Sequence, residues 1–155
     1  MRFATVSARL AVAAAVAGSA LVGVTPAQAA ATSTIVCEET KQVEEASYDV
    51  NSGCWLQNGD RVQISASGLI WAGVWLTGQN GPQGWTNMAN DSKFPMTNAR
   101  AFSLLAKTNG NYRYAGTGTT FTYYGTGSTL YLRINDDTPG NGNGAFTADV
   151  TVTRG

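Results

Sequence analysis

The chain has 155 residues, with ten basic and ten acidic side chains and no histidine. This balance argues against a nucleic-acid or anionic-membrane partner, because both require a concentrated basic patch. The lack of histidine excludes Ser-His-Asp and Cys-His catalytic systems and removes a common zinc ligand. Few carboxylates are placed to flank a glycosidic bond. We therefore expect a protein that is not an enzyme.

The first 29 residues have the order of a secretory signal peptide. Arg2 and Arg9 flank a short positive region, which is followed by an apolar run over 10–24, and Ala27-Gln28-Ala29 supplies the small residues of a cleavage site. The run is too short to span a bilayer comfortably. We predict a secreted protein without membrane insertion, whose mature chain, residues 30–155, forms a single domain. Cleavage leaves eight basic residues against ten acidic, a net charge of −2.

Both cysteines, Cys37 and Cys54, lie in the exported part of the chain. An even number of cysteines in an oxidising compartment predicts one disulfide. A reactive thiol would need a histidine partner, which the sequence lacks. The acidic residues Glu38, Glu39, Glu44 and Glu45 are expected to lie on a solvated surface.

Alternating apolar and polar residues predict short strands separated by turns rich in Gly, Asn and Thr. In chain order, strands are expected over residues 61–66, 71–76, 102–107, 112–115, 120–124, 130–134 and 146–153. This pattern predicts an all-β fold, an antiparallel jelly-roll-like β-sandwich. Residues 73–98 show no clean period and are expected to form a functional loop packed by Trp75, Trp85 and Phe94.

The segment from Ile134 to Phe146 concentrates oxygen donors on a glycine-rich loop between two predicted strands. Its oxygen-bearing side chains are Asn135, Asp136, Asp137, Thr138, Asn141 and Asn143. Calcium takes 6–8 oxygens from carboxylates, amides and carbonyls, and such a loop can wrap one ion. The spacing is not that of an EF-hand or a nucleotide-binding loop. The same residues are also common in an ordinary hairpin turn.

Several motifs, in order, resemble the PA-IL (LecA-type) family of calcium-dependent, galactose-binding bacterial lectins. They are Gly59-Asp60-Arg61-Val62 leading into Ala66-Ser67-Gly68, then Gly81-Pro82-Gln83-Gly84, Asn135-Asp136, Gly140-Asn141 and Gly144-Ala145-Phe146. The resemblance covers residues 59–152 and implies a galactose-binding-domain-like sandwich.

The resemblance also implies roles for individual residues. Asp136 would bind calcium through its carboxylate and Asn141 through its amide oxygen, while Thr138 and Ala72 would each supply a backbone carbonyl. Gly142 stands where the family has a second asparagine, so Asp137 or Asn143 would have to substitute.

Sugar recognition would involve the same loop and the long one before it. Two sugar hydroxyls would complete the calcium shell beside Asp136 and Asn141. Asn90 and Asp91 stand where the family uses His and Gln at the primary hydroxyl, and Trp85 would stack on the ring.

We therefore expect a secreted lectin that holds a galactose-like mono- or oligosaccharide through one Ca²⁺. The sequence is compatible with a monomer or a homo-oligomer. The alternative is a structural or interaction module of the same fold whose metal and sugar site has degenerated, an interpretation favoured by Gly142 and the missing histidine.

Overall fold

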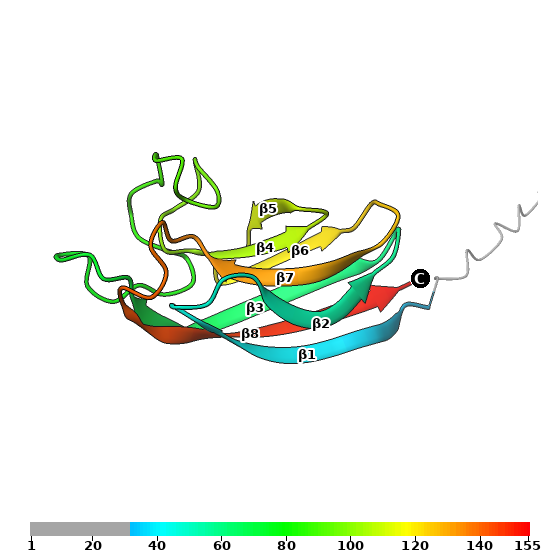
Figure 1. Cartoon of the computed structure of the whole chain (residues 1–155). Coiled ribbons are helices and arrows are strands. Elements are labelled where there is room, and N and C mark those ends of the chain that lie inside the picture. Colours follow the sequence, from blue (N-terminus) through cyan, green and yellow to red (C-terminus); the bar gives the residue numbers. More distant parts are fainter. Residues whose placement is uncertain (1–31) are drawn as a thin grey trace, which may run out of the picture. The chain divides into compact units, whose positions relative to one another are not determined.

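The computed structural model describes residues 32–155 (Figure 1). The predicted signal peptide, residues 1–29, lies outside this range. Within the described part of the chain, no helix is both long enough and apolar enough to cross a membrane.

Eight strands form two antiparallel four-stranded sheets, with strand orders β1-β8-β3-β6 and β2-β7-β4-β5. Their bounds are β1 Thr34–Glu44, β2 Val50–Leu56, β3 Arg61–Trp71, β4 Leu104–Thr108, β5 Asn111–Tyr114, β6 Gly118–Thr122, β7 Ser128–Ile134 and β8 Asn143–Arg154. Consecutive strands mostly alternate between the sheets, which is the eight-stranded jelly-roll arrangement. The predicted fold class is confirmed.

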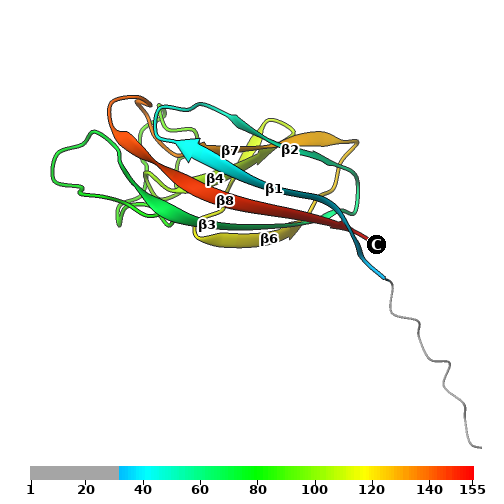
Figure 2. The ribbon, with the colours of Figure 1, turned by 90° about the horizontal axis from the view of Figure 1, so that it is seen from below.

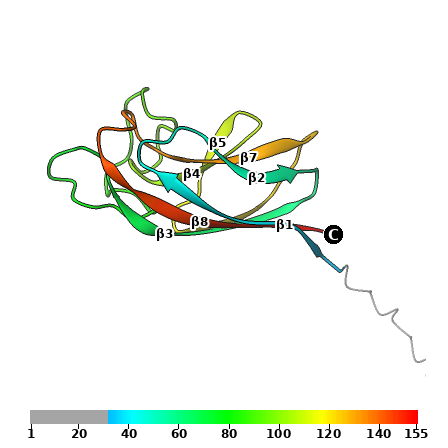
Figure 3. The same cartoon turned by 60° about the horizontal axis from the view of Figure 1, so that its bottom comes forward.

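The hydrophobic core lies between the two sheets, which Figure 3 shows as separate layers. In β3 and β8, inward-facing residues alternate with outward-facing ones, because successive side chains of a strand point to opposite faces. Val62 pairs with Val152, and Ile64 pairs with Val150, and all four are almost completely buried. Leu130, Leu132 and Ile134 of β7 cover them from the other sheet.

Six of the seven predicted strands exist, with ends shifted by a few residues. The strand predicted over 71–76 is wrong, because β3 ends at Trp71 and the next residues turn. Gly73 and Leu76 both have positive φ, +72° and +76°, a conformation that ends an extended strand. The prediction also missed β1 and β2.

Strand β1 corrects the interpretation of the acidic cluster. The odd-numbered residues from Cys37 to Val43 face inward, whereas Glu38 and Glu44 face solvent. Glu45 directly follows β1, and its N–H donates to the carbonyl of Gly144, which continues the pairing with β8. The side chain of Glu45 therefore lies on the inner face with only 1% exposure, not on a solvated surface.

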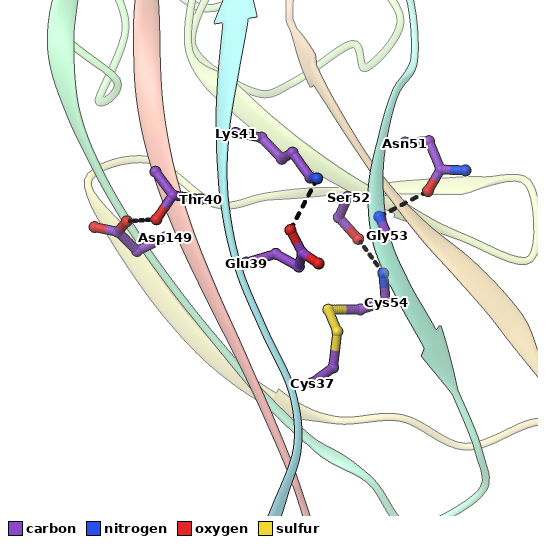
Figure 4. A network of polar contacts seen from close by, with 9 residues as sticks. All are labelled: Cys37, Glu39, Thr40, Lys41, Asn51, Ser52, Gly53, Cys54 and Asp149. Atoms are coloured by element: carbon purple, nitrogen blue, oxygen red, sulfur yellow. Dashed lines mark hydrogen bonds and ion pairs between the residues drawn. A yellow bond between two sulfur atoms is a disulfide. The ribbon is translucent and has the colours of Figure 1, made fainter.

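The predicted disulfide between Cys37 and Cys54 is confirmed. It joins β1 of one sheet to β2 of the other, as Figure 4 shows, and Cys54 is fully buried. Beside it, Lys41 Nζ lies 2.9 Å from Glu39 Oε2. The bond therefore links the two layers of the sandwich covalently.

The ion pair between Asp60, which lies between β2 and β3, and Arg154 at the end of β8 predicts that stability depends on pH. Asp60 is buried and accepts two hydrogen bonds of 2.7 Å from the guanidinium. These bonds hold the pKa of Asp60 below its ordinary value of 3.8. Because the folded pKa is the lower one, the stabilisation is complete above about pH 4 and declines as the pH falls through the folded value.

We expect Arg154→Met to lower the urea midpoint at pH 7, with the difference from wild type shrinking between pH 4 and pH 2. Urea titrations across that range measure it. A difference that is constant with pH would contradict the role assigned to the ion pair.

Candidate functional site

Three connections lie at the same end of the sandwich. They are residues 45–49 between β1 and β2, residues 72–103 between β3 and β4, and residues 135–142 between β7 and β8. Figures 1 and 2 both show these loops gathered at the end of the sheets opposite to the C-terminus. Residues that are far apart in the sequence are thereby brought together.

Asn135 fixes the long loop to the end of β7. Its amide group donates to the carbonyls of Met96 and Arg100 and accepts a hydrogen bond from the N–H of Met96, over 3.0–3.1 Å. Asn135 is completely buried. The first member of the Asn135-Asp136 pair therefore has a structural role and positions the second.

Asp136 is a buried carboxylate with one unsatisfied oxygen. The residue is 1% exposed, and its Oδ1 accepts the N–H of Thr138 at 3.0 Å. Among residues 32–155, its Oδ2 has no hydrogen-bond partner. Burial raises the pKa of Asp136 to about 7 despite the bond from Thr138, and the neighbouring Glu45 contributes to the rise. An uncompensated oxygen in such a place is costly unless it meets a proton or a cation.

Glu45 is a site residue that the sequence analysis missed. Both of its carboxylate oxygens accept the N–H of Gly140, at 3.2 and 3.1 Å, so the end of β1 holds the β7–β8 loop. A signal was present in the sequence. Glu45 lies two residues after the apolar Val43, and the period of a strand places both side chains on the same face.

The turn after β3 packs closely against the β7–β8 loop. A Cβ atom on Gly73 would overlap the side chain of Asn141, and one on Gly142 would overlap the carbonyl oxygen of Trp71. Ala72, which lies between Trp71 and Gly73 in the sequence, is fully buried. The structure thus brings the predicted ligands Ala72 and Asn141 to the same place, and it explains Gly142, since no larger residue fits there.

The other predicted ligands differ in exposure. Thr138 and Asn143 are exposed, and Asp137 is half-buried. A pocket of about 360 Å³ opens where β1 ends and β8 begins, with Glu45, Gly142 and Asn143 in its wall. The roles of Asp137, Thr138 and Asn143 as metal ligands stay predictions.

The predicted sugar contacts lie on the long loop. Asn90 and Asp91 are exposed, and Asp91 Oδ1 accepts the N–H of Lys93 at 3.0 Å in a local turn. Trp85 is half-buried, with its ring 6.3 Å from that of Phe102. A more exposed aromatic surface belongs to Trp75, 71% exposed, which with Trp71 and Gly73 lines a depression of about 680 Å³.

The donors around Asp136 suit a hard cation such as Ca²⁺. Carboxylate, amide and carbonyl oxygens are its preferred ligands. Within residues 32–155, no three side chains of His, Cys, Asp or Glu converge on one point. A cation here would therefore be held by carboxylate oxygens together with backbone and amide oxygens, and the unpartnered Asp136 Oδ2 fits the first of these.

Comparison with solved structures shows that the chain shares its β-sandwich fold with a known domain. It is similar to a structure described as the EclA N-terminal domain, a PllA-like lectin, with a TM-score of 0.59 and 21% sequence identity. The match covers 76% of this chain and 97% of the other. No protein-family model matches the sequence. In a sequence comparison, no curated protein matches it either.

Proposed function

We propose that the protein is a secreted, non-enzymatic lectin that holds a galactose-like sugar through one calcium ion at the β7–β8 loop. The observation that carries the proposal is Asp136, a buried carboxylate with a free oxygen on the β7–β8 loop, whose Asn141 and Gly142 pack against the turn after β3. The similarity of the fold to a PllA-like lectin supports it. The disulfide is in keeping with an extracellular protein.

In this proposal the ion and the loop read two neighbouring hydroxyls of the sugar. Exposed aromatic side chains offer a surface on which the apolar face of a sugar ring can stack, and Trp75 is the more exposed of the two tryptophans that line the depression with Gly73. Asn90 and Asp91 remain the candidates for the primary hydroxyl.

Calcium should stabilise the protein. A ligand that binds only the folded state adds about 2.7 kcal/mol when its concentration is a hundredfold above Kd. For a domain of this size, we expect the melting temperature to rise by several degrees. Asp136→Asn should abolish the rise, because the charged ligand is lost while the shape is kept. Thermal melts in calcium and in chelator measure both effects.

Calorimetric titration with galactose then tests the sugar. Binding should require calcium and disappear in chelator and in Asp136→Asn. An interaction module with a degenerate site is the second candidate, because the sequence lacks the second asparagine and the histidine of the lectin family it resembles. For this candidate, calcium should leave the melting temperature of wild type unchanged relative to chelator, and the same should hold for Asp136→Asn. That result would overturn the lectin proposal.

A further inference from the structure

The buried carboxylates of this protein fall into two kinds. Among residues 32–155, the acidic residues with exposure of 1% or less are Glu45, Asp60 and Asp136. Asp60 is neutralised by the guanidinium of Arg154 at 2.7 Å. In the same part of the chain, no lysine or arginine forms a salt bridge with Glu45 or Asp136.

Glu45 and Asp136 both bind the backbone of the β7–β8 loop, where Glu45 accepts the N–H of Gly140 and Asp136 accepts the N–H of Thr138. Burial raises the pKa of Asp136, and the nearby charge of Glu45 adds to the rise. Two neighbouring carboxylates away from water cannot both ionise cheaply. A buried charge is normally paired with an opposite charge or bound to a metal.

Free lone pairs remain on both groups. Glu45 receives a single donor, the N–H of Gly140, which its two oxygens share. Asp136 Oδ2 receives none from the part of the chain that the structure describes. Because a carboxylate offers about four acceptor positions, the pair retains several oxygen lone pairs within one buried place.

We propose that Glu45 supplies a second carboxylate to the cation site of Asp136, so that the ion is held between the end of β1 and the β7–β8 loop. This inference rests on the proposed function and adds a residue to the same site. It explains why a glutamate, and not an apolar residue, follows Val43 on the inward face at the end of β1. It also gives the site two negative charges, which a divalent ion neutralises.

The conservative variant Glu45→Gln tests this role with calcium alone as the probe. Its amide oxygen can still accept the N–H of Gly140, so the anchoring of the loop is kept. We expect the calcium Kd, measured by calorimetry, to rise on the order of ten- to a hundredfold, since ligand charge sets the affinity of such sites. In chelator, the variant should melt at the same temperature as wild type or higher, because the repulsion between the two carboxylates is removed.

Glu44→Gln is the matched control. Glu44 is the neighbouring residue, carries the same charge and is exposed. It should leave the calcium Kd unchanged within about twofold, because exposed charges are screened by solvent.

The outcomes separate this inference from the proposed function. If wild type binds calcium, Asp136→Asn does not, and Glu45→Gln binds it like wild type, Glu45 is only a structural anchor and the inference is overturned. If Glu45→Gln melts lower than wild type in chelator, the glutamate serves the apo fold instead, which also overturns it. If wild type binds no calcium, the proposed function itself fails.

Discussion

Removing the disulfide with the double substitution Cys37→Ala, Cys54→Ala should lower the free energy of unfolding by about 3 kcal/mol. The bond closes a loop with a sequence separation of 17 residues, and most of its effect comes from restricting the unfolded chain. Urea denaturation of the oxidised wild type and of the variant measures the difference.

Reduced wild-type protein is the control for this prediction, because it lacks the bond but keeps both sulfur atoms. It should lose nearly as much stability as the double variant. If reduction costs less than about 1 kcal/mol, the packing of the two sheets against each other is sufficient to hold the layers and the disulfide is dispensable.

Substitution of Gly142 by alanine should also have a large effect. The added Cβ would overlap the carbonyl oxygen of Trp71 and lie 2.8 Å from the backbone nitrogen of Gly73. Backbone atoms cannot move aside as a flexible side chain can, so the loop must separate from the turn after β3. We expect a loss of about 1–3 kcal/mol, typical of overpacking, together with loss of the calcium-induced rise in melting temperature.

Gly118→Ala is a suitable control for this variant. Gly118 lies in β6, and an added Cβ would make only one ordinary contact, 3.4 Å from the carbonyl oxygen of Ile64. Calcium should stabilise this variant as it does wild type. If Gly142→Ala instead keeps both stability and the calcium response, the close approach of the two loops is not needed for the site.

The sequence predicted the fold class well because its strands alternate clearly. Buried apolar residues alternate with more exposed neighbours in β3 and β7, as at Val62, Ile64, Leu130 and Leu132. Strand β1 was missed because its inward face carries Cys37, Glu39 and Lys41, which give no apolar alternation. A pattern based on hydrophobicity cannot detect a strand whose inner positions are occupied by a disulfide and charged residues.

The candidate site was predicted only in part for a related reason. Asp136 and Asn141 belong to one loop, so their proximity can be inferred from the sequence itself. Glu45 is 95 residues away from Gly140, and only the pairing of β1 with β8 brings them together. Contacts of this kind depend on the order of strands in the sheet, which neither composition nor spacing specifies.

The contact between Glu45 and Gly140 has a consequence for the order in which the protein folds. A contact between residues so distant in sequence forms only after the loop-closure entropy of the intervening chain has been overcome. The carboxylate pair is therefore assembled late, once β1 has docked on β8. An ion that needs both groups stabilises the native state more than the folding transition state, and so it slows unfolding while leaving the folding rate almost unchanged.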